Sequence, residues 1–428
     1  MKVLFIHQNF PGQYKYLAHQ MAACPDVQVT GVGEKKMVEQ RGRLLGVHTV
    51  CYDAPQPSHG QIHHYLRGYE AAVRRGQVVA RVLLDMRDKG YVPDVVCVHP
   101  GWGEALFVRD VFPASRILMF AEFYFRAGQA DIGFDPEFPA SVDWNFSARI
   151  RNSPQITSLI TADACISPTR WQASRFPEFV ARKTHVVHDG VNCAYMTPSP
   201  TARVRLQRTG IPGESRVLAD DTPLSDGVVL GPADRVLTFV NRNLEPYRGY
   251  HVFMRALPEI QRQNPDAHIL IVGGNETSYS PVLPAGQSYK ERYLAEVRER
   301  LDCSRIHFLG RVPYKVLREL FRIASAHVYL TYPFVLSWSV MEALACECLV
   351  IGSKTPPVEE VIRHGENGLL VDFFDREGLV DTVTRALHSP EQFVPLRKKA
   401  RETIVQNFEL DTCLDIQEKI IRQMAGNG

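Results

Sequence analysis

Two arginines that could bind phosphate follow an apolar run in the second half of the chain. The run Val236–Val240 reads as a buried strand, and Arg242 and Arg248 come after it, before a helical stretch that begins at Tyr250. A guanidinium group is a planar fork of N–H donors that matches phosphate oxygens. If only one of these arginines were present, we would interpret it as an exposed charge in a loop. The pair, at the carboxyl end of a strand, favours a diphosphate site that uses no metal.

A glutamate stands near the start of a short apolar helix further along the chain. The helix is predicted over Val340–Ala345, within the stretch YPFVLSWSVMEALAC. Ser339 and Glu342 have the spacing of a capping box, in which each side chain satisfies a backbone donor at the helix start. The same N–H groups would suit a phosphate, and a carboxylate would accept hydrogen bonds from sugar hydroxyls. A capping role and a ligand-binding role would use the same geometry at this helix start, and both stay open.

Polar residues also follow the apolar runs of the first half. Gly12 lies in the turn after the run Val3–Ile6, and Glu122 follows the run Ile117–Phe120. A glycine there permits close approach of a ligand, or simply makes the turn. Glu122 at a strand end could bind a sugar, and a surface glutamate beside core aromatics is the alternative. His99 occupies a comparable place after another apolar run.

Apolar runs that alternate with helical stretches predict the elements that position these residues. Such runs are typical of parallel strands in a sheet covered on both faces. The predicted strands are Val3–Ile6, Val27–Val32, Val95–Val98, Ile117–Phe120, Ala164–Ile166, His185–Val187, Val236–Val240, Ile269–Val272, Ile306–Leu309, Val328–Thr331, Leu349–Ile351 and Leu369–Val371. The fold class is therefore α/β, with two doubly wound parallel sheets in tandem, which place ligands at the carboxyl ends of their strands.

The order of the elements also predicts the domains. Residues 197–234 are rich in Pro, Gly and Asp, which indicates a connection between domains with a long, partly ordered loop. We expect a first domain over 1–192, a second over 193–405, and a C-terminal helix over 406–428 that packs back on the first.

Composition excludes several classes of protein. The 428 residues carry a formal net charge of +2, so charge does not indicate a nucleic-acid partner. No apolar run approaches the roughly 20 residues that cross a bilayer. Nine scattered cysteines without an export signal indicate free thiols in the cytoplasm. A helix face with His63, His64, Arg67, Arg74 and Arg75 is expected to be solvated, and it leaves peripheral contact with an anionic membrane open.

Taken in order, the motifs resemble those of the retaining glycosyltransferases of family 4, which have the GT-B fold. The resemblance rests on Pro11-Gly12, Arg242 with Arg248-Gly249, the segment Phe308–Pro313, the helix with Glu342, and the segment His364–Val371. It runs from Met1 to the last helix and is strongest from Leu237 to Val371.

This resemblance implies roles for individual residues. Two Rossmann-like domains would clasp a nucleoside-diphosphate sugar, which is a co-substrate, and no cofactor or metal is implied. Arg242 and Arg248 would bind the diphosphate, and Gly310 and Val312 would line the base. Glu342 would lie near the ribose. Gly12, in the turn after the first strand, would also contact the nucleotide sugar. The remaining contacts to it would come from the loop and the helix start before Glu342, at Leu336, Ser337, Trp338 and Ser339.

The sequence departs from the family pattern at three places. The first of the family's paired glutamates, which contacts the donor sugar, falls here on Phe334. A glycine pair expected before Glu360 is replaced by Pro356-Pro357, and Ala121 and Glu122 stand near the place of a family histidine. An apolar ring accepts no hydroxyl hydrogen bond, so these changes leave the donor sugar open.

The predicted function is metal-independent glycosyl transfer with retention, from a nucleoside-diphosphate sugar to a glycan, glycolipid or small-molecule acceptor. Arg242 and Arg248 would stabilise charge on the leaving diphosphate, and Glu122 would orient the donor sugar or the acceptor. Two alternatives remain. The protein could bind a nucleotide sugar as a non-catalytic partner subunit, since Phe334 replaces an acid, or it could be a GT-B nucleotide-sugar epimerase.

Overall fold

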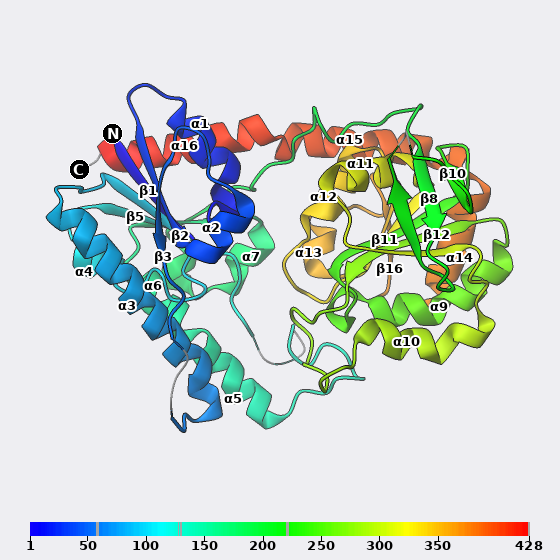
Figure 1. The fold of residues 1–428 in the computed structure, drawn as a ribbon, viewed down its shortest axis with the longest axis horizontal. Helices are drawn as coiled ribbons and strands as arrows, with labels where there is room; N and C mark the ends of the chain where they lie inside the picture. Colours follow the sequence, from blue (N-terminus) through cyan, green and yellow to red (C-terminus); the bar gives the residue numbers. More distant parts are fainter. Residues whose placement is uncertain (57–59, 127, 129–130, 220–221, 427–428) are drawn as a thin grey trace. The chain divides into compact units, whose positions relative to one another are not determined.

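The computed structural model describes residues 1–56, 60–126, 128, 131–219 and 222–426. Within them the chain forms two compact units. Unit 1 comprises Met1–Gly190 and the C-terminal helix α16 (Leu410–Gly426), and unit 2 comprises Val191–Glu409. Figure 1 shows each unit as a sheet covered by helices. The expected C-terminal segment 406–428 includes residues 427–428, which lie outside the described residues.

Unit 1 is built on a seven-stranded parallel sheet in the order β3-β2-β1-β4-β5-β6-β7. Its strands are β1 (Lys2–Ile6), β2 (Gln28–Glu34), β3 (His48–Tyr52), β4 (Val95–Val98), β5 (Arg116–Phe120), β6 (Ala164–Ser167) and β7 (Thr184–Val186). Continuous apolar runs form the central strands because both of their faces are buried.

The helices of unit 1 cover both faces of this sheet. They are η1 (Gly12–Tyr14), α1 (Lys15–Ala22), α2 (Lys35–Arg41), η2 (His64–Leu66), α3 (Arg67–Asp88), α4 (Val108–Val111), α5 (Val142–Arg151), α6 (Ser153–Ile160), α7 (Arg170–Arg175), α8 (Glu178–Ala181) and α16. One buried cluster joins β1 to α1 and α16, and a second joins the opposite face of β1 to α3 and α4.

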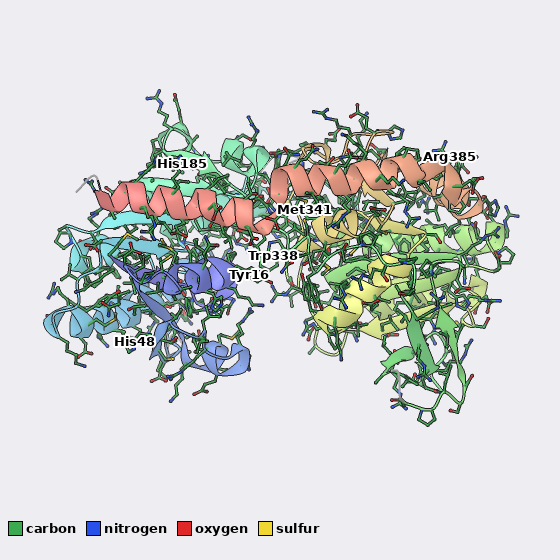
Figure 2. The ribbon with its side chains drawn as sticks, turned by 90° about the horizontal axis from the view of Figure 1, so that it is seen from above. Tyr16, His48, His185, Trp338, Met341 and Arg385 are labelled. Atoms are coloured by element: carbon green, nitrogen blue, oxygen red, sulfur yellow. The ribbon has the colours of Figure 1, made fainter. Side chains whose placement is uncertain are left out.

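The strand β3 was missed by the sequence analysis. It carries His48, which Figure 2 labels, and pairs only with β2 at the edge of the sheet. Most of its residues are only partly buried, so its sequence HTVCY lacks the continuous apolar run that marks a central strand.

Unit 2 contains a six-stranded parallel sheet in the order β13-β12-β11-β14-β15-β16. Its strands are β11 (Val236–Asn243), β12 (His268–Gly274), β13 (Ile306–Gly310), β14 (Ala326–Tyr329), β15 (Val350–Ser353) and β16 (Leu369–Val371). The strand order reverses between β11 and β14, which is where ligands bind in doubly wound sheets.

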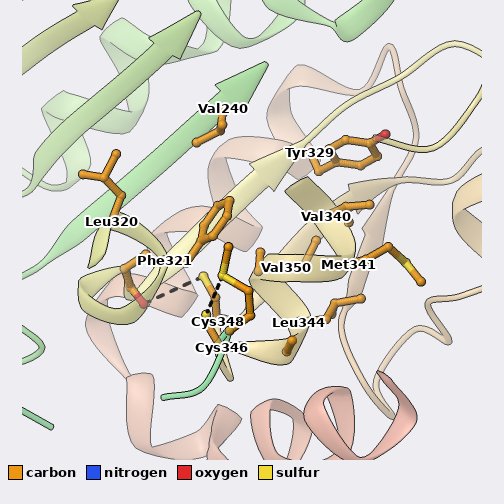
Figure 3. Packing of buried hydrophobic residues seen from close by; sticks show 14 of the residues in the cluster. Val240, Leu320, Phe321, Tyr329, Val340, Met341, Leu344, Cys346, Cys348 and Val350 are labelled. Carbon is orange, nitrogen blue, oxygen red and sulfur yellow. Dashed lines mark hydrogen bonds between the residues drawn. The ribbon is translucent and has the colours of Figure 1, made fainter. Parts of the chain in front are cut away.

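Helices cover both faces of the unit 2 sheet as well. They are η3 (Pro246–Arg248), α9 (Tyr250–Gln263), α10 (Tyr289–Val297), η4 (Arg298–Arg300), α11 (Tyr314–Ile323), α12 (Trp338–Ala345), α13 (Pro356–Glu359), α14 (Arg376–His388), η5 (Pro390–Phe393) and α15 (Val394–Phe408). Figure 3 shows the buried cluster on one face, to which Val340 and Leu344 of α12 contribute beside Phe321 and Val350. The predicted α/β class with two doubly wound sheets is confirmed.

The expected loop over 197–234 is wrong in its described part. The strands β8 (Val204–Arg208), β9 (Ser215–Leu218) and β10 (Gly227–Leu230) form an antiparallel sheet in the order β10-β8-β9. Val204, Leu206 and Leu230 belong to the buried cluster of unit 2. Residues 220–221 of this segment lie outside the described residues.

Candidate functional site

Arg248 is buried at the carboxyl ends of β11 and β14, where the strand order of unit 2 reverses. Its Nη1 donates to the Tyr329 hydroxyl (3.2 Å), to Thr331 Oγ1 (3.0 Å) and to the carbonyl oxygen of Val335 (2.9 Å). The Nε and Nη2 edge has no hydrogen-bond partner in the described part of the chain. One nitrogen therefore anchors the group, and the other edge keeps a pair of donors that fits two phosphate oxygens.

The backbone around Arg248 makes a tight turn. Gly249 has φ +68°, and a Cβ on it would lie 2.2 Å from Leu330 Cβ. Only glycine combines this left-handed conformation with so close an approach. The turn leads directly into α9 and leaves the Arg248 side chain directed at β14 and the loop after it.

Aromatic rings surround the Arg248 guanidinium. Its Cζ lies 5.4 Å from the Phe334 ring centroid and 5.6 Å from the Tyr279 ring centroid, within the range of cation–π attraction. Phe334 and Tyr279 contact each other with their centroids 4.6 Å apart, and Tyr247 meets Phe334 edge-on at 5.5 Å. Phe334 is thus part of an aromatic cluster on the guanidinium, at the position where the family resemblance predicts an acid.

Arg242 lies near the end of β11 and is exposed. It makes no hydrogen bond or ion pair with the described residues. Arg242 thus lies within the end of β11 and is exposed, whereas Arg248 follows the same strand and is anchored by hydrogen bonds. That pattern is compatible with diphosphate binding, and their role stays a prediction.

The helix α12 begins at Trp338, two residues before the predicted start, and Ser337 is its N-cap. Ser337 Oγ accepts from the N–H of Ser339 (3.3 Å), so the expected capping box with Ser339 as cap is wrong. The Ser337 N–H donates to the buried Tyr329 hydroxyl (2.8 Å), which holds the chain just before the helix. Leu336 and Ser339 are buried, and Trp338, labelled in Figure 2, is 49% exposed.

Glu342 is buried on α12 and has a partner that the sequence did not predict. The Tyr314 hydroxyl of α11 donates to Glu342 Oε1 at 2.7 Å. Burial raises the pKa of Glu342 to about 6, and the hydrogen bond from Tyr314 opposes that rise. This carboxyl group therefore changes charge close to neutral pH.

The loop after β13 holds the two residues expected at the base. Gly310 is exposed with φ +60° and open space where a Cβ would stand, and Val312 packs partly against the core. Arg311 between them donates to Asn243 Oδ1 at the end of β11 (3.0 Å). This contact ties the loop to the strand that carries Arg242.

Glu122 lies in unit 1, where it follows β5. Its Oε1 accepts from Gln13 Nε2 (3.1 Å), and its Oε2 lies 3.2 Å from His99 Nε2. His99 Nδ1 accepts from the Gly101 N–H, so Nε2 carries the ring proton and donates to Glu122. Burial opposes ionisation, but the bonds from His99 and Gln13 outweigh it and hold the pKa of Glu122 below its usual range.

Gly12 also has a structural role in unit 1. It has φ +49°, and a Cβ on it would lie 2.6 Å from the His7 ring. Burial and the neighbouring His99 lower the pKa of His7 well below its usual value, which keeps the ring neutral. His7, His99 and Glu122 therefore form a polar group at the carboxyl ends of β1, β4 and β5.

The expected basic face on α3 is only partly solvated. Arg75 turns inward, lies 3.5 Å from the buried Glu104 and donates to the Trp102 carbonyl oxygen. Arg74 pairs with Glu70, and His64 lies 3.2 Å from Asp143. Within the described residues, no helix is long and apolar enough to cross a bilayer.

Three residues of unit 2 were missed because their contacts join distant segments. The Tyr314 hydroxyl donates to Glu342, and the Tyr279 ring lies beside the Arg248 guanidinium. The Glu245 carboxylate accepts from the Tyr279 N–H. Only Glu245 carried a signal in the sequence, as an acid between two arginines in an otherwise buried turn.

Known proteins resemble both halves of the chain. Residues 26–196 match the Glycosyl transferase family 4 group, and residues 227–403 match the Glycosyl transferases group 1. D-inositol 3-phosphate glycosyltransferase of Segniliparus rotundus is 23% identical over 235 residues, which are 54% of this chain and 46% of that protein. The matched part thus spans about half the length of this curated relative.

Solved structures show the same architecture along the whole chain. Sucrose-phosphate synthase from Thermosynechococcus elongatus has a TM-score of 0.72 at 18% identity and covers 100% of both chains. Anabaena HepE in complex with UDP has a TM-score of 0.65 at 15% identity, over 99% of this chain and 100% of that one. At these identities the likeness shows the fold alone.

Proposed function

The chain belongs to the family 4 glycosyltransferases and has the GT-B fold, and on that premise we propose that it transfers a sugar from a nucleoside-diphosphate sugar. The acceptor would be a glycan, glycolipid or small molecule, and the anomeric configuration would be retained. The observation that carries the proposal is the Arg248 guanidinium, which is anchored through Nη1 and keeps a free edge at the strand reversal of unit 2.

The proposed chemistry depends on charge at the leaving diphosphate. Departure of this group builds negative charge on its oxygens, and preorganised donors in a partly dry site stabilise such charge. The Arg248 edge, the exposed Arg242 and the partial positive charge at the start of α12 would supply this stabilisation. These groups carry the positive charge themselves, so the mechanism that we propose needs no metal ion.

Retention follows in this proposal from attack on the face that the diphosphate leaves. A leaving phosphate oxygen then takes the proton of the acceptor hydroxyl, and no separate base is required. Glu122 would accept a hydrogen bond from a sugar hydroxyl, because its carboxylate is held ionised by His99 and Gln13 and its side chain is 32% exposed. Glu342 would accept hydrogen bonds from the ribose.

Phe334 affects how the donor sugar would be recognised. A buried ring cannot accept the hydroxyl hydrogen bond that a carboxylate would accept at this position. We propose that sugar recognition relies on backbone groups of the loop Leu336–Trp338, together with the apolar surface of the aromatic cluster. The HepE structure contains UDP, which makes uracil the first base to test.

A thermal-shift screen tests this proposal. Nucleoside diphosphates with different bases, and their sugars, are added to the whole chain, and a ligand that binds the native state raises the melting temperature. We expect one base to stabilise the chain, and its diphosphate to be released from the matching sugar when an acceptor is added. A sugar isomer formed without acceptor would indicate an epimerase, and binding without release would indicate a partner subunit.

A further inference from the structure

Glu245 is a buried carboxylate to which the proposed reaction assigns no role. Its side chain is 1% exposed, and its oxygens accept hydrogen bonds from three consecutive backbone N–H groups. The distances are 3.2 Å from Ser278, 3.0 Å from Tyr279 and 2.9 Å from Ser280. A carboxylate is costly to bury unless donors satisfy it. Because these donors are consecutive, Glu245 fixes the conformation of the loop that follows β12.

The same residue also fixes the turn that carries Arg248. The carbonyl oxygen of Glu245 accepts from the Arg248 N–H at 3.0 Å, which closes the single turn of η3. A second bond joins the two segments, from the Tyr247 N–H to Ser280 Oγ at 3.1 Å. Glu245 therefore holds the backbone of Arg248 with its main chain and the backbone of Tyr279 with its side chain.

This double attachment places the Tyr279 ring beside the guanidinium. The ring centroid lies 5.6 Å from Arg248 Cζ and 4.6 Å from the Phe334 centroid. Guanidinium groups stack on aromatic faces, which restricts their rotation as well as attracting them. Without the carboxylate, three N–H groups would lose their acceptor and the loop would be free to carry Tyr279 away.

We propose that Glu245 is a positioning residue, which seats Tyr279 on the Arg248 guanidinium and so aims the free Nε and Nη2 edge at the donor diphosphate. The inference rests on the proposed function and deepens it, since it assigns the orientation of the phosphate-binding group to a third residue. Glu245 itself touches no substrate in this account.

If Glu245 were only structural, its loss would lower stability without acting through Tyr279. A double-mutant cycle of Glu245 and Tyr279 distinguishes this structural role from the proposed positioning role. The variants are Glu245→Leu, which removes both acceptor oxygens, Tyr279→Leu, and the double variant. A glutamine would not do, because the three N–H groups converge on Oε2 and an amide oxygen could still accept from them there. Binding of UDP, GDP, ADP and dTDP is measured by calorimetry on the whole chain. Glu214→Leu is the matched control, because Glu214 is a partly buried carboxylate of unit 2 that pairs with Lys290 at 2.7 Å.

We expect each single variant to bind the preferred diphosphate about tenfold more weakly, and the double variant to bind no more weakly than either, because both changes remove one stacked ring. Glu214→Leu should bind like the wild type. Additive losses, or wild-type affinity in Glu245→Leu, would overturn the inference.

A second pair of variants covers the case in which Glu245→Leu does not fold. Tyr279→Phe keeps the ring and should bind like the wild type, whereas Tyr279→Leu should bind about tenfold more weakly. Equal affinity of these two variants would contradict the inference while leaving the proposed function intact. A wild-type chain that binds none of the four diphosphates would refute the proposed function, and the inference with it.

Discussion

Arg248 Cζ and the Phe334 ring centroid lie 5.4 Å apart, so an aromatic ring stands beside this cation at the position where the family resemblance predicts a glutamate. The ring shields one side of the guanidinium, and Nη1 is held by Tyr329, Thr331 and Val335. A planar, delocalised cation suits this environment better than a compact ammonium group does.

Arg248→Lys is therefore not a conservative change. Lysine keeps the charge, but its single nitrogen cannot both bind these acceptors and offer a planar fork of donors to phosphate. We expect release of nucleoside diphosphate from the preferred donor to fall by at least about tenfold. Arg242→Lys is the control, because Arg242 is exposed and without a stacked ring, and it should lose less. Equal losses would show that charge alone matters at Arg248.

Two glycines with similar backbone conformations should respond differently to alanine. Gly249→Ala adds a Cβ 2.2 Å from Leu330, whereas Gly310→Ala adds one in open space, and both positions have positive φ. We expect Gly310→Ala to cost about 1 kcal/mol of unfolding free energy from backbone strain, and Gly249→Ala about 3 kcal/mol or more from strain and overpacking. Thermal unfolding measures both, and similar losses would refute the tight contact at Gly249.

Tyr314→Phe should change the pH dependence of nucleotide binding. Burial raises the pKa of Glu342 to about 6, and the Tyr314 hydroxyl favours its ionised form. If the carboxylate binds the ribose, affinity falls as pH drops through about 6 in the wild type. Removing the hydroxyl raises the pKa further, so the fall should begin at higher pH in the variant. An unchanged midpoint in calorimetric titrations would separate Glu342 from the nucleotide.

Buried histidines should make the protein sensitive to acid. Burial lowers the pKa of His327 to about 3, while an unfolded histidine titrates near 6.5. Below that pH the unfolded state binds more protons, so stability falls as pH drops from about 6.5, by up to about 1.4 kcal/mol per pH unit for this group. His327→Leu should flatten the pH dependence of the melting temperature. An equally steep dependence in the variant would assign it to other groups.

The parallel sheets could be predicted from the sequence because their central strands are buried on both faces. Runs such as VVCV of β4 and HILIV within β12 need no tertiary information to be recognised. The strands β3 and β8 to β10 could not be predicted in this way, since they lie at an edge or in a small antiparallel sheet and are only partly apolar.

The candidate site could be predicted only in part. Arg242, Arg248 and Glu122 were proposed because they stand at or after strand ends, which gather at one edge of a sheet. The contact from Tyr314 to Glu342, and those from Glu245 to the loop after β12, join residues 28 to 35 positions apart. No local pattern encodes such contacts. Ser337 caps α12 in place of the predicted Ser339, and its own N–H donates to the buried Tyr329 hydroxyl, a contact that the capping pattern does not include.

The account depends most on contact between Arg248 and the diphosphate, and a comparison of ligands tests that contact directly. Calorimetry measures the affinity of the preferred nucleoside diphosphate and of the nucleoside without phosphate, for the wild type and for Arg248→Ala. We predict that the variant loses about ten- to hundredfold in affinity for the diphosphate and nothing for the nucleoside. An equal change for both ligands, or none for either, would contradict the account.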